Sequence, residues 1–199
     1  MRMLMVASLL VSGLMHVAKA QNQPTASRAY QLSAFGAASG VYTGLEGGKN
    51  ALLTAGGDLE LLPFHGVRPA IEVRGSYPVD GGNIASQRSL LGGLKLGFLA
   101  GHALRPYGDF LIGRGQMNYP AHDGVNGFLY NDLVYTLTTT TVYSPGFGVD
   151  YQFSPHVALK VDGQYQRWSL TPTPSGVIYS KVGSVGLVYY FSFDRRRGR

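Results

Sequence analysis

Apolar and polar residues alternate along much of the chain, and this period of two restricts the fold more than any other feature. Between residues 143 and 153, aromatic and aliphatic residues fall mostly on one face, while Gly, Ser, Asp and Gln fall on the other. Segments 157–166 and 184–193 follow the same rule. Successive side chains of a β-strand point to opposite faces, so the pattern predicts strands with two different surroundings. After residue 20 we find no convincing helical stripe.

The whole sequence predicts eight strands joined by connections of alternating length. The predicted strands are 27–41, 50–62, 67–78, 86–99, 105–119, 138–153, 156–169 and 177–193. The connections after the second, fourth and sixth are short, and the others are mostly longer. Short turns at one end and long loops at the other are typical of bacterial outer-membrane barrels. We therefore predict an all-β fold, an eight-stranded antiparallel up-and-down transmembrane β-barrel.

A soluble, lipocalin-like barrel is the alternative fold, with apolar residues inside and polar residues outside. Periodicity alone does not say which face is which. Three features favour the membrane: the sorted connections, the aromatic end of the last strand, and a charged face rich in Gly and Ser. A closed barrel also pairs every backbone polar group, which lipid requires.

The first twenty residues have the build of a secretory signal peptide. Arg2 precedes a mostly apolar stretch from Met3 to Met15, and Ala18-Lys19-Ala20 is a small-x-small cleavage site. We expect three parts: a signal peptide over 1–20, a barrel over 21–193 and a basic tail over 194–199. The chain has no cysteine, so stability must come from backbone pairing and packing.

The net charge of +6 does not indicate nucleic-acid binding. Six of the 17 basic residues lie in the signal peptide or the tail, which leaves 11 basic and 10 acidic residues between Gln21 and Phe193. A nearly neutral barrel has no basic face to follow phosphates. We expect no nucleic-acid partner.

The polar face predicts a lumen filled by ion pairs. Nine charged residues fall on this face by parity: Asp58, Glu60, Glu72, Arg74, Lys95, Arg114, Asp150, Lys160 and Asp162. The fifth segment is irregular, because the parity of Arg114 also includes Phe110 and Ile112, with Asp109 opposite. A bulge near Gly108 or Gly113 would repair it.

An eight-stranded barrel is just wide enough for its own side chains, and buried charges must be paired. We therefore expect a structural plug. Asp150 and Lys160 flank a tight turn symmetrically and should be cross-strand neighbours, while Asp58 and Arg74 are diagonal candidates. A narrow porin-like pore for small solutes is the alternative.

The last strand carries a family resemblance. Residues Ser184 to Phe191 follow the order polar, x, Gly, x, x, aromatic, x, aromatic, which resembles the insertion signal of outer-membrane proteins through Ser184, Gly186, Tyr189 and Phe191. The signal usually ends the chain, whereas residues 192–199 follow it here. With eight segments, the chain resembles the small outer-membrane barrels typified by the OmpA transmembrane domain and OmpX. The resemblance implies outer-membrane lipids and the barrel assembly machinery as partners, and a structural or surface-interaction role.

Histidines provide little support for catalysis or metal binding. His65, His102 and His156 open predicted strands at the short turns, where equivalent positions are spread around a rim rather than convergent. A lipid A-modifying enzyme is a further alternative, with His122 beside Asp123 as its incomplete constellation. We expect no enzyme activity, no cofactor and no metal. The apolar residues between 128 and 135 mark either an interaction surface or an extension of the flanking strands.

Overall fold

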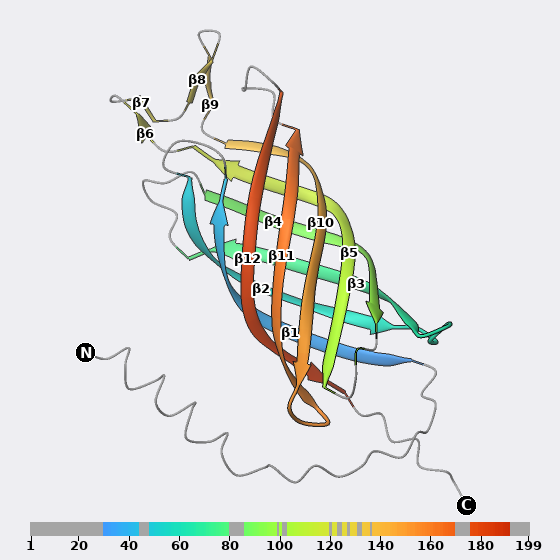
Figure 1. The fold of residues 1–199 in the computed structure, drawn as a ribbon. Helices are drawn as coiled ribbons and strands as arrows, with labels where there is room; N and C mark the ends of the chain where they lie inside the picture. Colours follow the sequence, from blue (N-terminus) through green and yellow to red (C-terminus); the bar gives the residue numbers. More distant parts are fainter. Residues whose placement is uncertain are drawn as a thin grey trace, which may run out of the picture.

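The computed structural model describes residues 30–43, 48–79, 86–98, 100, 103–119, 137–169 and 176–191, together with four short strands between 121 and 135. Eight long strands dominate it (Figure 1): β1 Gln31–Tyr42, β2 Lys49–Glu60, β3 Val67–Pro78, β4 Ser86–Phe98, β5 Leu104–Asn118, β10 Leu137–Gln152, β11 Val157–Ser169 and β12 Val177–Tyr190. Their bounds match the eight predicted segments to within about four residues.

The long strands form one closed barrel. Each pairs antiparallel with its neighbours in the chain, and β1 pairs with β12 from Ser33–Tyr190 to Tyr42–Lys181. The predicted eight-stranded antiparallel fold is thus confirmed. We call the end where β2–β3, β4–β5 and β10–β11 are connected the short-turn end, and the opposite end the long-loop end. Closure leaves the barrel sheet without an edge strand.

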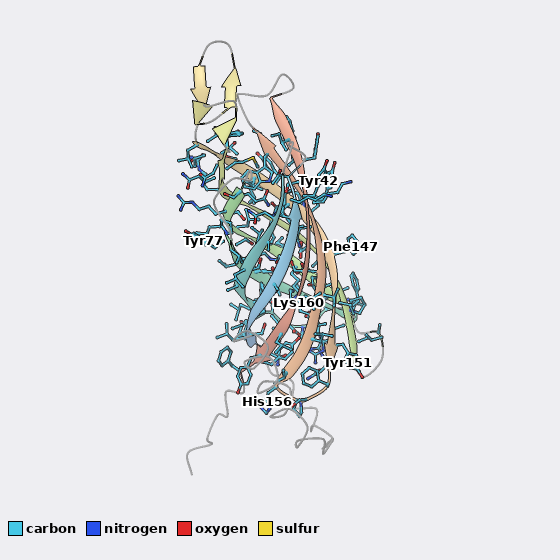
Figure 2. All side chains as sticks on the ribbon, turned by 90° about the vertical axis from the view of Figure 1, so that its left-hand side faces the viewer. Tyr42, Tyr77, Phe147, Tyr151, His156 and Lys160 are labelled. Carbon is cyan, nitrogen blue, oxygen red and sulfur yellow. The ribbon has the colours of Figure 1, made fainter. Side chains whose placement is uncertain are left out.

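The outer wall of the barrel is apolar on every strand. Large side chains that are exposed there include Leu32, Leu53, Ile71, Val73, Leu90, Leu94, Phe110, Ile112, Phe147, Val161, Val185 and Leu187. Leu53 is 64% exposed and Phe147 is 75% exposed, and Figure 2 shows Phe147 projecting from the wall while Lys160 lies within the barrel. A water-soluble barrel would have the opposite arrangement, so the lipocalin-like alternative is wrong for this chain.

Among the described residues, no helix has the length and apolar character needed to cross a membrane.

Strand β5 is regular, and the bulge suggested by the sequence is absent from it. Its pairing with β4 runs without interruption from Asn118 to Tyr107, and its pairing with β10 runs from Asn118 to Leu104. Phe110 and Ile112 therefore point outward, and Asp109 points into the lumen.

Four short strands form two separate hairpins in the longest connection. Strand β6 (Ala121–His122) pairs with β7 (Val125–Asn126), and β8 (Phe128–Tyr130) pairs with β9 (Leu133–Tyr135). Figure 1 shows both hairpins beyond the long-loop end. These residues pair within the connection, so they do not extend β5 and β10.

The residues that resemble an insertion signal lie on β12, which closes the barrel, except for Phe191, which directly follows it. Ser184 accepts a hydrogen bond from Ser39 of β1 at 2.8 Å between the hydroxyl oxygens. A Cβ on Gly186 would lie 2.2 Å from the carbonyl oxygen of Gly36, so only glycine permits this approach of β12 to β1. Tyr189 faces outward and contacts Phe191 edge to face. Contacts within the barrel and on its wall therefore account for Ser184, Gly186 and Tyr189 at these positions.

Candidate functional site: the closed lumen

The lumen near the long-loop end is filled by apolar side chains. Trp168 on β11 is fully buried and packs with residues of β4, β5, β10 and β12. The members of this cluster are Leu91, Leu111, Met117, Tyr119, Val142, Trp168 and Ile178. Val41, Leu52 and Val182 form a second buried cluster on β1, β2 and β12. These apolar side chains fill much of this part of the described lumen.

Hydroxyl and amide groups lie beside and below these apolar clusters in the lumen. Ser39 is hydrogen-bonded to Thr54 and to Ser184, each at 2.8 Å between oxygens. Gln87 donates to Gln166 at 3.1 Å and accepts from Ser180 at 2.9 Å. The Ser39 bonds join β1 to its neighbours β2 and β12, whereas the Gln87 bonds join β4 to β11 and β12 across the lumen.

A cluster of buried charges occupies the lumen nearer the short-turn end, and Arg74 is at its centre. The Arg74 guanidinium lies 2.6 Å from a Glu72 oxygen and 2.8 Å from an Asp162 oxygen, and 3.8 Å from Asp109. Arg74 is on β3, Asp109 on β5 and Asp162 on β11. One guanidinium thus connects three strands across the barrel.

Two lysines complete the charge cluster. Lys95 Nζ lies 3.0 Å from an Asp58 oxygen and 3.4 Å from an Asp150 oxygen. Lys160 Nζ lies 3.7 Å from Asp162 and 4.0 Å from Asp150. Both ammonium groups also lie over the Tyr107 ring, at 4.0 and 4.2 Å from its centre. The face of an aromatic ring attracts a cation. The Tyr107 ring therefore adds to the attraction between these ammonium groups and their carboxylates, several of which are not in close contact.

The cluster contains more acids than bases. Five buried carboxyl groups face three buried cations in the described lumen. Neutral donors serve some of the carboxyl groups: Gln164 donates to both oxygens of Asp109 at 3.0 Å, and Tyr107 donates to Asp162 at 3.3 Å. Ser33 donates to Asp58 at 3.4 Å. Such charge-assisted bonds are the stronger ones, and they make the network continuous.

A small space remains at one end of the described lumen. A cavity of about 40 Å³ opens toward the short-turn end, between Asp58, Lys95, Tyr107 and Asp150. That volume holds a few water molecules. Beyond it, the charge cluster and the apolar cluster around Trp168 fill the barrel. In the residues that the structure describes, the lumen is therefore filled along its length by side chains.

The structure places seven of the nine predicted lumen residues in this cluster: Asp58, Glu72, Arg74, Lys95, Asp150, Lys160 and Asp162. Glu60 is half-buried at the short-turn end, where it pairs with Arg68 at 2.8 Å. The prediction for Arg114 is wrong, because Arg114 shares the outward parity of Phe110 and Ile112 and is exposed. Asp109 takes a lumen position that sequence reasoning missed. The outward parity of two large apolar residues was the signal that could have found it.

The register agrees with both predicted placements, but only one of them gives the predicted ion pair. Asp150 lies directly opposite Lys160 on the paired strands. Asp58 lies opposite Glu72 and is therefore diagonal to Arg74. Its cation is nevertheless Lys95, which reaches it from β4, while Arg74 is held by Glu72 and Asp162.

The histidines lie apart from this network. His65 has a positive φ of 49° in the β2–β3 turn, and its ring contacts Phe64. His156 stacks on Tyr189 in the β10–β11 turn. No group of three potential ligands is close enough to hold a metal ion among the described residues. His102, Asp123 and the side chain of His122 lie outside the described residues.

No family model and no curated protein sequence matches the chain. Solved structures, in contrast, match the chain. The crystal structure of Neisserial surface protein A aligns with a TM-score of 0.52 and 15% identity, covering 82% of this chain and 98% of that one. The N-terminal barrel domain of Pseudomonas aeruginosa OprF aligns at 0.43, with 16% identity over 81% and 96%. Ail of Yersinia pestis aligns at 0.45, with 12% identity over 81% and 97%. The likeness to Neisserial surface protein A shows that this chain has the fold of a small outer-membrane β-barrel.

Proposed function

We propose that the protein is an integral outer-membrane barrel that acts through its surface, with a lumen closed to solutes. The filled lumen is the observation that carries this proposal. Arg74 and Lys95 are each held by carboxylates from other strands across the lumen, Lys160 lies near Asp150 and Asp162, and Trp168 fills the next part of the lumen. The charge cluster and the packed residues around Trp168 follow one another along the lumen, so a solute would have to displace both.

Planar-bilayer conductance of the full-length protein purified from membranes tests the closed lumen. We expect no discrete channel steps. A narrow porin-like pore would instead give steps whose size changes in Lys95→Gln, because Lys95 lies in the lumen. Arg114→Gln is the matched control, since it removes the same charge from the outer wall. Steps that respond to Lys95→Gln and not to Arg114→Gln would overturn the proposal in favour of the pore.

Kinship with the OmpA- and OmpX-like barrels is part of the same proposal. The antiparallel eight-strand order and the aromatic outer face of β12 support it. We infer that the barrel assembly machinery inserts the chain through its last strand, and that outer-membrane lipids surround the apolar wall. The expected test result is loss of membrane insertion when Tyr189 and Phe191 are both replaced by Ser.

The two hairpins β6–β7 and β8–β9 are the surface that we propose for interaction. They extend beyond the long-loop end (Figure 1), where loops of such barrels carry recognition. Deleting residues 121–135 should abolish adhesion of expressing cells to cultured cells or matrix while the barrel stays folded. Unchanged adhesion would remove this part of the proposal.

The proposed role is not catalytic. A His122→Ala strain should produce unaltered lipid A by mass spectrometry. Loss of a lipid A modification in that strain would favour the enzyme instead.

A further inference from the structure

Charge is divided between the two sides of the barrel wall. All six acidic residues in the described chain face the lumen or its mouth, and none is exposed. Five basic residues are exposed on the outer wall: Lys49, Arg88, Arg114, Arg167 and Lys181. The described outer wall therefore carries five positive charges and no acidic residue that could pair with them.

These five cations all lie near the long-loop end of the barrel. Lys49 begins β2, and the other four lie within five residues of the long-loop ends of β4, β5, β11 and β12. At the short-turn end, the exposed outer wall has aromatic residues such as Tyr30, Phe98 and Tyr151, with no exposed Lys or Arg among the described residues. The difference indicates a ligand that is present on only one side of the membrane.

Tyrosines stand between the cations. Tyr42 lies at the same register as both Lys49 and Lys181 on its two neighbouring strands. Tyr165 is the β11 partner of Lys181 and stacks on Tyr179 at 5.4 Å between ring centres. Tyrosine collects at the interface between lipid tails and water. The cations are therefore at headgroup depth, where an outward charge costs little.

One part of this rim has the shape of a lipid site. A shallow hollow on the outer wall is lined by Tyr42, Lys49, Lys181, Gly40 and Ala51. Gly183 of β12 lies beside Gly40, so the row below the cations is Gly183–Gly40–Ala51 across three strands. A Cβ added at Gly40 or Gly183 would meet nothing within 4 Å. The wall is thus flat and open directly below two cations.

We propose that this hollow binds a phosphate-bearing glycolipid of the lipid A type from the leaflet on the long-loop side. Lys49 and Lys181 bind its phosphate, and an acyl chain lies on the flat row at Gly183, Gly40 and Ala51. The inference rests on the proposed outer-membrane function. Charge complementarity carries it, because the described wall offers these cations no carboxylate and an anionic lipid surface attracts each of them.

Native mass spectrometry of the detergent-solubilised full-length protein, titrated with lipid A, tests the site. The unmodified protein should retain lipid A, and lipid A stripped of its phosphates should not be retained. The double variant Lys49→Gln, Lys181→Gln should weaken retention about twenty-five-fold, since each cation near an anionic surface contributes about fivefold. The charge-matched control is Arg88→Gln, Arg114→Gln on the opposite part of the rim, which should retain lipid A at this site.

Gly40→Leu separates shape from charge. The leucine side chain has open space on the outer wall, so the barrel should fold normally, yet it should fill the hollow and reduce lipid A retention at least fivefold. Equal losses in the two double variants, or normal retention in Gly40→Leu, would overturn the site. Flotation with neutral phosphatidylcholine vesicles distinguishes the two proposals: a chain that does not float with them fails as a membrane barrel, whereas one that floats without lipid A preference fails only here.

Discussion

The two halves of the lumen are closed in different ways. Near the long-loop end, Trp168 and its neighbours exclude water by packing. Near the short-turn end, three cations and five carboxyl groups exclude solutes by binding one another. Packing needs only apolar residues of suitable size, whereas a buried charge must find a partner at a particular distance. The first half therefore depends mainly on volume, and the second depends on strand register.

Removal of Arg74 should have the largest effect on the charged half. Arg74→Ala leaves Glu72 and Asp162 without their shared cation, and breaking a buried ion pair costs about 3–5 kcal/mol. Urea unfolding in lipid vesicles, followed by Trp168 fluorescence, measures the loss. Adding Asp162→Asn should recover part of it, because one surplus negative charge disappears. A loss no larger than that of exposed Arg114→Gln would contradict the role of Arg74.

Trp168→Ala tests the packed half with the same denaturant titration. Truncating a buried large aromatic costs about 3 kcal/mol or more, and we expect a loss at that lower bound because Leu111 and Val142 can partly fill the space. Unlike the Arg74 variant, this one should not be rescued by Asp162→Asn. Since Trp168 is the single tryptophan, tyrosine fluorescence or circular dichroism must report unfolding. Rescue by Asp162→Asn would show that the halves are coupled.

Gly115→Ala should disturb the packed half less. The new Cβ would lie 2.4 Å from the Trp168 ring, so the ring must shift, and overpacking of this kind costs about 1–3 kcal/mol. Gly75→Ala is the control, because its Cβ meets nothing closer than 3.9 Å. The midpoint of thermal unfolding should fall for the first variant and stay nearly constant for the second. Equal midpoints would mean that the packing around Trp168 is loose.

The smallest loss of stability is expected from a substitution between the two halves of the lumen. Ser39→Ala removes the hydroxyl that links Thr54 to Ser184, and one such net hydrogen bond is worth about 1 kcal/mol. Thr54 keeps a second partner in Ser76 at 3.0 Å, which limits the loss. Urea midpoints compared with those of Ser89→Ala, a substitution on the opposite wall, would reveal it. A loss of stability larger than that of Gly115→Ala would contradict the expected order of these effects.

The strands were predictable because alternation is a local property of the sequence. Each strand of a barrel has one lipid-facing and one lumen-facing side, so period two marks the existence of the strand. The two hairpins in the connection between β5 and β10 were not predicted, since runs of two or three residues are too short to show a period.

The lumen residues were mostly predictable by parity, but most of their ion-pair partners were not. Arg114 was assigned to the wrong face because an outward arginine near the end of a strand looks polar in the sequence, like a lumen residue. Its neighbours Phe110 and Ile112 give the correct face. Arg74 binds Asp162 on a strand 88 positions away in the chain. Such a contact depends on barrel closure and on which side chains meet across it, neither of which alternation specifies.

The pairing of β1 with β12 has a consequence for connectivity. The backbone N–H of Phe191 donates to the carbonyl of Leu32 at 2.9 Å, so the start of the first strand and the end of the last are adjacent at the short-turn end. Every long strand is then hydrogen-bonded to two antiparallel neighbours. The barrel can therefore be traced in the same way starting from any of its strands. A circularly permuted chain, with residues 30 and 191 joined by a short turn and new termini placed between residues 80 and 85, should enclose the same lumen.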